Sequence, residues 1–253
     1  MNGKVAIVTG ASSGIGRAAA RLFAEGGYTA VAVGRNEKEL SALSQSIKSK
    51  KGAVKIHLAD VTEHSQLDRI VSETVDNYGR IDVLVNSAGI IKSGTIENTT
   101  LDDWDKMMNI NIRSVFVLIQ KCLPYLIETK GNIVNVSSVA GTRSFPNVLA
   151  YCVSKAAVDQ LTRCMALELA SKVVRVNAVN PGVVVTNIHK RGGMEDEAYN
   201  AFLEHSKTTH PIGRVGTAAE VAELIYYLTS EKASWITGAT YEIDGGRAQT
   251  CAR

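Results

Sequence analysis

Residues 4 to 16 read Lys4-Val5-Ala6-Ile7-Val8-Thr9-Gly10-Ala11-Ser12-Ser13-Gly14-Ile15-Gly16. The apolar run before Thr9 predicts a buried strand, and the glycine-rich turn leads directly into a segment with helical spacing. In such a turn Gly10 permits the sharp bend, Gly14 lets the backbone approach a pyrophosphate, and Gly16 lets the helix pack against the strand. The N-terminal dipole of that helix then faces the phosphates. A glycine-rich turn by itself is also common as a plain connection, so the interpretation depends on the rest of the chain.

Strands and helices alternate along the remaining sequence. Further strands are predicted at Thr29–Val33, Val54–Leu58, Asp82–Val85, Ile133–Val136, Val174–Val179 and Thr240–Ile243. Helices are predicted at Gly16–Glu25, Glu37–Lys50 and Gln66–Tyr78, and later ones open at the capping sequences that begin with Thr100 and Thr217. This alternation predicts the α/β class, with a doubly wound, mostly parallel Rossmann-like sheet of about seven strands and helices on both faces. Ligands of such sheets bind beyond the carboxyl ends of the strands.

Length and composition fit one globular unit. The chain has 253 residues, of which 45% are hydrophobic and 21% charged, and no Pro/Ser/Gly-rich linker divides it. We therefore expect a single domain over residues 1–253. The longest apolar run, Val115–Ile119, falls far short of the ~20 residues that cross a bilayer, so no membrane span is expected.

Charge and cysteine usage narrow the choice of partners. A formal net charge of +3 is too small to suggest a nucleic-acid partner. The first strand begins so early that no secretion signal fits before it, which favours a cytoplasmic protein. The four cysteines lack paired C-x-x-C spacing and the five histidines lack metal-ligand spacing, so no metal site is predicted.

The clearest chemical signal is the pair Tyr151 and Lys155, with Ser138 thirteen residues upstream. If the chain is helical after Ala150, the two side chains share one helix face about one turn apart. An ammonium group beside a phenol of pKa ~10 lowers that pKa by roughly 1–3 units. Tyr151 then becomes a proton donor that works near neutral pH. Taken alone, the pair fits a chance contact on a surface helix equally well.

The order of these motifs resembles that of the classical short-chain dehydrogenase/reductases. The resemblance spans almost the whole chain and is carried by Thr9-Gly10-x-x-x-Gly14-x-Gly16, Asn86-Ser87-Ala88-Gly89, Asn111, Ser138, Tyr151-x-x-x-Lys155 and Pro181-Gly182. It implies that Tyr151 transfers a proton to or from the substrate oxygen while Ser138 orients the carbonyl group. Lys155 would lower the pKa of Tyr151 and hold the nicotinamide ribose, and Asn111 would hold a water that links Lys155 to solvent. Ser137 and Asn109 are the competing residues beside Ser138 and Asn111.

The same resemblance implies a dinucleotide site. Its predicted residues are Gly10, Ser12, Ser13, Gly14, Ile15, Gly16, Arg35, Asn36, Asp60, Val61, Asn86, Ala88, Gly89, Tyr151, Lys155, Pro181, Gly182, Val184 and Thr186. Ser87 departs from the commoner family Asn, which weakens one expected hydrogen bond, although a serine hydroxyl can still donate and accept. Asp60 is matched to the adenine ring, although an aspartate at a strand end is often only a turn or helix cap.

The end of the second strand favours NADP(H) over NAD(H). Gly34 stands where NAD-dependent members usually carry Asp, and Arg35 follows at once. A charge-assisted bond from Arg35 to a 2′-phosphate is worth about 1.5–3 kcal/mol. NAD(H) is the alternative, because an arginine that points into solvent would give no preference.

The resemblance leads to an oxidoreductase that interconverts a ketone and a secondary alcohol. The overall likeness is greatest to 3-oxoacyl-carrier-protein reductases, but Lys130 and Lys172 replace the arginines usual at the carrier contacts. A steroid, sugar or xenobiotic carbonyl is the alternative substrate, and a non-catalytic NADPH-binding sensor is the alternative of another class. Residues Asn187–His210 are predicted as a helical flap, with His189, Met194, Phe202 and His205 as substrate contacts. Family members usually form homotetramers through helices that correspond to Thr100–Glu128 and Ala150–Ala170.

Overall fold

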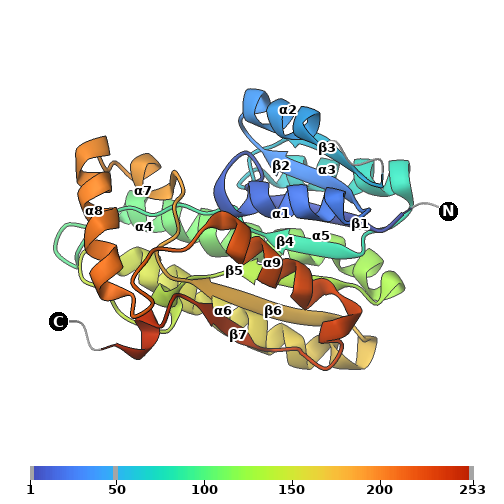
Figure 1. Ribbon diagram of the computed structural model, residues 1–253. Helices are drawn as coiled ribbons and strands as arrows, with labels where there is room; N and C mark the ends of the chain where they lie inside the picture. Colours follow the sequence, from blue (N-terminus) through green and yellow to red (C-terminus); the bar gives the residue numbers. More distant parts are fainter. Residues whose placement is uncertain (1–2, 48–50, 251–253) are drawn as a thin grey trace.

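A computed structural model describes residues 3–47 and 51–250 and shows one seven-stranded sheet (Figure 1). The strand order is β3-β2-β1-β4-β5-β6-β7, and every neighbouring pair is parallel. The strands are β1 (Val5–Thr9), β2 (Thr29–Gly34), β3 (Ala53–Leu58), β4 (Val83–Asn86), β5 (Asn132–Val136), β6 (Arg175–Pro181) and β7 (Thr240–Ile243). The chain winds outward from β1 in both directions, so the predicted doubly wound Rossmann-like sheet is confirmed.

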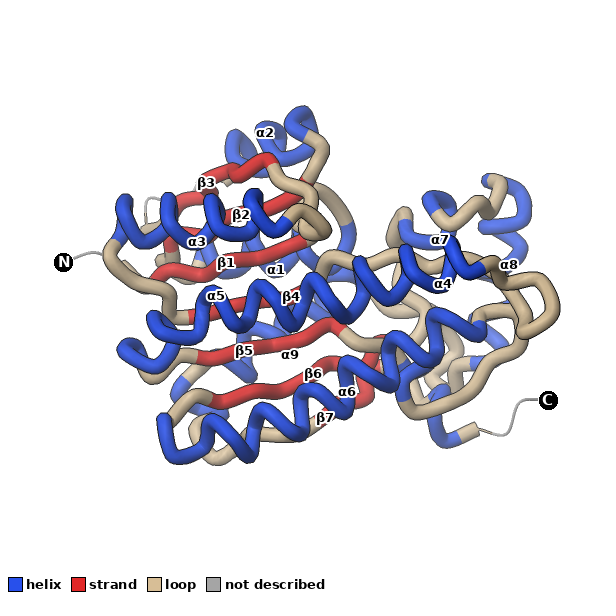
Figure 2. The backbone as a smooth tube through the Cα atoms, turned by 180° about the vertical axis from the view of Figure 1, so that it is seen from behind, coloured by secondary structure: helices blue, strands red, loops and turns tan. Residues whose placement is uncertain are grey.

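Helices cover both faces of the sheet (Figures 1 and 2). They are α1 (Gly14–Glu25), α2 (Glu37–Ser46), α3 (His64–Tyr78), α4 (Leu101–Met108), α5 (Ser114–Thr129), α6 (Leu149–Leu169), α7 (Ile188–Arg191), α8 (Asp196–Thr209) and α9 (Ala218–Thr229). Buried residues of α3, α5 and α6 share one core cluster, and those of α1, α2 and α9 share another. The short α7 and the longer α8 lie beyond the carboxyl ends of the strands (Figure 1).

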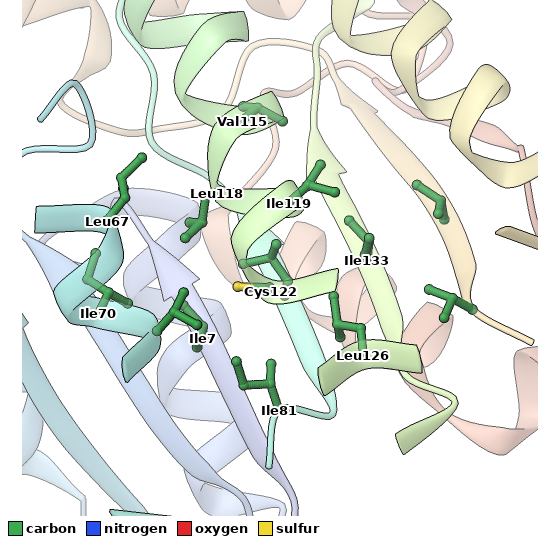
Figure 3. Close-up of a cluster of buried hydrophobic side chains, with 14 of the residues drawn as sticks. Ile7, Leu67, Ile70, Ile81, Val115, Leu118, Ile119, Cys122, Leu126 and Ile133 are labelled. Atoms are coloured by element: carbon green, nitrogen blue, oxygen red, sulfur yellow. The ribbon is translucent and has the colours of Figure 1, made fainter. Parts of the chain in front are cut away.

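Strand β1 shows how the sequence pattern produces this layering. Successive strand side chains point to opposite faces, so Val5 and Ile7 enter the cluster under α3, α5 and α6, while Ala6 and Val8 enter the other cluster. All five residues of the strand are buried, which explains why the sequence is apolar without alternation. Figure 3 shows Ile7 among side chains of α3 and α5.

The helix predicted at Glu37–Lys50 is shorter than expected. The Asn36 side chain caps the start of this helix by accepting a hydrogen bond of 3.1 Å from the Glu39 N–H. Asparagine is one of the residues preferred at this position. Helix α2 ends at Ser46, whose hydroxyl donates to the Leu43 carbonyl and so competes with the backbone ladder. Ile47 follows in extended conformation, and residues 48–50 of the prediction lie outside the described residues.

Helix α5 contains a proline, Pro124, that does not end it. The helix runs on to Thr129 with Pro124 inside it. The proline deprives the Gln120 carbonyl of its helical partner, but Gln120 is exposed to solvent. Meanwhile Cys122 and Leu126 on either side of the proline are completely buried. Apolar packing therefore outweighs one lost hydrogen bond at the surface.

The helical segment Leu101–Thr129 meets a length and hydropathy test for a membrane span. That test is weak evidence, because the core helices of soluble proteins also pass it, and half of the most apolar window is buried inside the fold. The buried side chains Leu118, Ile119 and Leu126 belong to the core cluster shown in Figure 3. Core packing thus explains the apolar composition of this segment.

A buried carboxylate joins the starts of β1 and β4. Asp82 accepts a hydrogen bond from the Val5 N–H at 2.8 Å and two from the Arg80 guanidinium at 2.9 and 2.6 Å.

We expect Asp82→Ala to lower the free energy of unfolding by about 2 kcal/mol, because it leaves a buried N–H and a guanidinium unpaired. Glu204→Ala, which removes a surface partner of Lys207, should change it by less than about 0.5 kcal/mol. Urea unfolding measures both, and equal effects would contradict this account.

Candidate active site

A cavity of about 960 Å³ opens at the carboxyl ends of the strands. Its walls come from the loop after β1, the ends of β2 to β6, helix α4, the start of α6, and the α7–α8 segment. This is where a doubly wound sheet collects its ligands. The volume lies near the upper end of the range of roughly 300–1,000 Å³ for small-molecule sites, which leaves room for a dinucleotide beside a small substrate.

The glycine turn after β1 is held tightly against the loop after β4. Gly10 has φ +68°, and a Cβ at this position would lie 2.8 Å from the Ser87 carbonyl oxygen. The Thr9 hydroxyl accepts hydrogen bonds from the N–H groups of Ser87 and Ala88 at 3.0 and 3.1 Å. These contacts fix the two loops as one wall of the cavity. The sequence motif contains Thr9, but its side-chain role becomes visible only in the folded chain.

Helix α1 presents a free N-terminus to this wall. Its N-cap residue Ser13 makes no side-chain capping bond, and the first turn carries no acidic residue. The unpaired N–H groups at the start of the helix and the helix dipole therefore favour an anionic ligand. The Ser13 hydroxyl instead accepts a hydrogen bond of 3.0 Å from Arg191 of α7. The dinucleotide pyrophosphate fits this position by charge.

Helix α6 brings Tyr151 and Lys155 together with Ser138 at the end of β5. All three side chains are buried and line the cavity. The Lys155 Nζ lies 5.6 Å from the centre of the Tyr151 ring and donates a 2.9 Å hydrogen bond to the Val136 carbonyl. The hydroxyl groups of Ser138 and Tyr151 are hydrogen-bonded. A substrate oxygen placed at these two hydroxyls would meet two donors.

Ser137, the competing serine, has a different environment. Its hydroxyl donates to the Lys155 backbone carbonyl at 3.1 Å and is also bonded to the Asp159 carboxyl group. Ser138 instead accepts from the Ala140 N–H at 3.1 Å and contacts Tyr151. The geometry therefore favours Ser138 as the serine that meets a substrate and Ser137 as part of its support.

The pKa values of the pair differ from the sequence-based expectation. Burial raises the pKa of Tyr151 above its usual value, and the hydrogen bond from Ser138 opposes this only in part. Burial also lowers the pKa of Lys155 to about 8, with the Asp159 carboxylate acting in the opposite sense. The expected lowering of the Tyr151 pKa by Lys155 is thus wrong for the protein alone, because desolvation dominates and the ammonium group is turned toward the Val136 carbonyl.

Asn111 lies in one turn of π-helix, Asn109–Arg113, between α4 and α5. Its carboxamide accepts from the Ile90 N–H at 2.9 Å and donates to the Ile90 carbonyl at 3.0 Å and to the Ser154 hydroxyl at 3.0 Å. A Cβ built on Gly89 would lie 3.4 Å from Asn111 Oδ1 and 3.6 Å from Lys155 Nζ. Asn111, and not Asn109, therefore joins the loop after β4 to the helix that carries Lys155.

Most of the predicted cofactor residues line the cavity. They are Gly10, Ser12, Ser13, Gly14, Ile15, Arg35, Asp60, Val61, Ala88, Gly89, Tyr151, Lys155, Pro181, Gly182, Val184 and Thr186. Three others lie outside its lining: Asn36, Asn86 and Gly16. Asn36 caps α2, and Asn86 donates to Asn135 at 2.9 Å within the sheet. Gly16 allows close packing, since a Cβ there would lie 2.6 Å from the Gly10 carbonyl oxygen.

The corner after β2 contains an ion pair. Arg35 Nη1 lies 3.2 Å from Asp60 Oδ2. Burial alone would raise the Asp60 pKa, but hydrogen bonds from Thr62 and Arg35 hold it below its usual value. Arg35 therefore reaches along the cavity edge and does not simply point away from the protein, although 69% of its side chain is exposed.

The predicted flap forms α7 and α8, separated by Gly192 and Gly193. Of its four predicted contact residues, His189 and Phe202 line the cavity, whereas Met194 and His205 do not. The rings of His189 and Phe202 pack edge to face with centroids 4.7 Å apart, and burial lowers the pKa of His189. Other wall residues carried no signal in the sequence: Ile90, Ile91, Met107, Ile110, Phe145, Val148, Arg191 and Arg247.

Two further features concern metals and carrier contacts. Within residues 3–47 and 51–250, no group of three His, Cys, Asp or Glu side chains is arranged to hold a metal ion. Lys130 and Lys172 lie two and three residues before β5 and β6, near the amino ends of these strands. In a single chain they are therefore far from the cavity that would receive a carrier-bound substrate.

Comparisons with known proteins agree with this geometry. A family profile described as enoyl-(acyl carrier protein) reductase matches residues 10–248. The 3-oxoacyl-(acyl-carrier-protein) reductase of Thermotoga maritima is 39% identical over 97% of this chain and 98% of its own length. The meso-2,3-butanediol dehydrogenase of Serratia marcescens is 36% identical over 96% and 94%.

A solved structure shows the same architecture. A short-chain dehydrogenase/reductase of unknown function from Caenorhabditis elegans, crystallised with cofactor, superposes with a TM-score of 0.92 at 36% identity, covering 98% of this chain and 96% of its own. The chain therefore belongs to the short-chain dehydrogenase/reductases, oxidoreductases that interconvert a carbonyl and an alcohol with NAD(P)(H).

Proposed function

We propose that the protein is an NADP(H)-dependent oxidoreductase that interconverts a ketone and a secondary alcohol, with Ser138, Tyr151, Lys155 and Asn111 as its proton-transfer residues. The observation that carries this proposal is that two hydroxyl groups and a buried ammonium group line one cavity with the free N-terminus of α1. We also propose that residues 1–253 form one domain, because strands from Val5 to Ile243 share a single sheet.

In the reduction, Ser138 and Tyr151 hold the substrate oxygen by hydrogen bonds and polarise the C=O bond. The nicotinamide cofactor supplies the hydride when it is bound. Tyr151 gives its phenolic proton to the oxygen as the carbonyl carbon becomes tetrahedral. Its raised pKa keeps that proton in place at neutral pH. Lys155 offers a positive charge beside the resulting phenolate, and Asn111 fixes the position of the Gly89–Ile90 loop next to the Lys155 ammonium group.

We place a free ketone ahead of a carrier-bound thioester as substrate, because Lys130 and Lys172 stand where the carrier contacts are usually arginines. The thioester reading draws on the relative from Thermotoga maritima, but the lysines at the carrier positions lie at the opposite edge of the sheet. A non-catalytic NADPH sensor has no need of a buried Tyr–Ser pair beside a lysine, because burying polar groups costs stability. We therefore favour a catalytic oxidoreductase over a non-catalytic sensor.

Replacing Tyr151 tests the proposal directly. Tyr151→Phe should lower kcat for ketone reduction by about 10²–10⁴-fold, because the proton donor is lost while the ring still fills its site. NADPH binding, measured by fluorescence titration, should change by less than about threefold. Tyr226→Phe, which removes a phenolic hydroxyl from α9 outside the cavity lining, serves as the control. Activity of Tyr151→Phe above about a tenth of the parent would refute the assigned role.

The preference for NADP(H) rests on Arg35. The parent should use NADPH with a kcat/KM about 10–100-fold above that for NADH, matching one charge-assisted bond of about 1.5–3 kcal/mol. Arg35→Gln should remove most of this preference, because it weakens the binding of NADPH and leaves that of NADH unchanged. Arg21→Gln, an exposed arginine on α1, should leave the ratio unchanged. Equal use of both cofactors by the parent would show that Arg35 does not select NADPH.

We propose that the protein is a homotetramer, because exposed apolar side chains gather on two different parts of the surface. Phe116, Val153 and Leu167 are exposed on α5 and α6, the helices predicted to form one interface. Tyr227 and Trp235 are exposed near α9 and β7. A tetramer with two-fold symmetry needs two distinct self-complementary interfaces, which these two groups can supply.

A charge at the first interface should break the assembly. Leu167 is 84% exposed, and Leu167→Glu should convert tetramers to dimers in light scattering, because it places like charges together across an apolar contact. Ile96→Glu makes the same change on a loop outside both helices and should leave the mass unaltered. A parent protein that remains monomeric at all concentrations would contradict the proposal.

A further inference from the structure

A half-buried arginine lies in the wall of the cavity at a position that the proton-transfer mechanism does not use. Arg247 begins the 3-10 helix η5 (Arg247–Gln249), a short turn after β7. It lines the same cavity as Tyr151 and Phe145. Its guanidinium carbon lies 4.9 Å from the centre of the Phe145 ring, a cation–π contact. Phe145 in turn packs against the apolar cluster that contains Tyr151.

The position of Arg247 separates it from the cofactor phosphates. It follows β7, the edge strand, whereas the glycine turn follows β1. Four strand spacings separate β1 from β7 in the sheet order, which corresponds to about 19 Å at ~4.8 Å per spacing. Arg35 follows β2, one strand farther away. Arg247 therefore belongs to the substrate end of the cavity, near the reacting hydroxyls.

The charge of Arg247 is poorly compensated by the described residues. Its one hydrogen bond to a described residue runs to the Thr209 hydroxyl of α8, while a guanidinium carries five N–H donors. The oxygens of Asp244 accept instead from the N–H groups of Gly246 and Ala248, and no ion pair joins Asp244 to Arg247 within residues 51–250. Burial lowers the pKa of Arg247, and the nearby Asp244 carboxylate acts in the opposite sense without forming an ion pair.

Other cations of the cavity wall are accounted for. Arg35 and Lys92 are paired with Asp60 and Asp103. Lys155 is bound to the Val136 carbonyl, and Arg191 to the Ser13 hydroxyl. Lys106 is exposed on α4. Arg247 differs from them because it is half-buried, stacked on an aromatic ring and not in ion-pair contact with any carboxylate of the described residues.

We propose that Arg247 binds the carboxylate of the substrate, so that the enzyme acts on short oxo acids and the corresponding hydroxy acids. This inference rests on the proposed function. A guanidinium matches a carboxylate through two parallel hydrogen bonds. The carboxylate stays unchanged in the reaction: the carbonyl carbon gains the hydride of NADPH, the oxygen gains the Tyr151 proton, and the products are the hydroxy acid and NADP⁺. Arg247 is then a specificity-determining residue.

The test compares each oxo acid with its own methyl ester, which is nearly the same size but uncharged. A series that includes acetoacetate and levulinate covers different distances between ketone and carboxylate. The parent should reduce the preferred acid with a kcat/KM at least tenfold above that of its ester. Arg247→Met, which removes the charge but keeps an unbranched apolar side chain beside Phe145, should raise KM for the acid about 10–100-fold and change ester kinetics by less than threefold. Arg247→Lys should retain part of the preference.

Binding without turnover gives a second readout. The acid should bind to the NADPH complex of Tyr151→Phe in calorimetry, and this binding should be lost when Arg247→Met is added. Arg21→Met, which changes an exposed arginine on α1, is the matched control and should leave both readouts unchanged. The inference would be overturned if the esters react and bind as well as the acids. It would also be overturned if Arg247→Met lowers kcat/KM equally for acid and ester, because that result would indicate a structural role.

The two proposals fail in different ways. If the enzyme reduces neutral ketones but no oxo acid, the carboxylate-binding role of Arg247 is wrong and the proposed oxidoreductase function still holds. Failure of every carbonyl compound to react, with Tyr151→Phe indistinguishable from the parent, would remove the proposed function. In that case acid binding that still depends on Arg247 would support the carboxylate site independently.

Discussion

The arrangement of the cavity depends on a close backbone approach at the end of β1. The loop after β1 lies so near the loop after β4 that a Cβ on Gly10 would sit 2.8 Å from the Ser87 carbonyl oxygen. The Thr9 hydroxyl closes the same contact with two hydrogen bonds. Gly16 then allows α1 to return over the turn, so the positive end of the helix faces the cavity. A side chain at either glycine would displace this helix and, with it, the anion-binding end of the site.

The proton-transfer group depends on a second layer of buried polar contacts. Asn180 donates to the Ser138 carbonyl at 3.1 Å and to the Asp159 carboxylate at 2.8 Å, and Asp159 is bonded to Ser137. This network fixes the backbone that carries Ser138 and places a carboxyl group near Lys155. Burial has opposite effects on the pair, since it raises the pKa of Tyr151 and lowers that of Lys155. The raised pKa favours the protonated phenol of Tyr151, which is the form needed for carbonyl reduction.

Local patterns in the sequence predicted the sheet, most helices and the Ser138–Tyr151–Lys155 group, because hydrophobic periodicity and fixed spacings encode them. The errors arose where tertiary contacts decide. Burial, and not the charge of Lys155, decides the direction of the Tyr151 pKa shift, which no local pattern reveals. Phe145 and Arg247 are more than 100 residues apart and become neighbours only through the strand order. The glycine turn was predictable because it joins a strand to the helix that follows directly in the sequence.

The ion pair between Arg35 and Asp60 is compatible with a phosphate bound at the turn after β2. The interaction free energies of the two contacts show why. An ion pair this exposed contributes roughly 0–1 kcal/mol, since water screens it. A charge-assisted bond to a phosphate contributes about 1.5–3 kcal/mol, so Arg35 gains by turning toward a 2′-phosphate. Asp60 keeps its hydrogen bonds from Thr62 when Arg35 leaves it. Gly34 packs against Ser12, where an acidic side chain would repel the phosphate. The pair thus holds Arg35 at the cavity edge without making it unavailable to a phosphate.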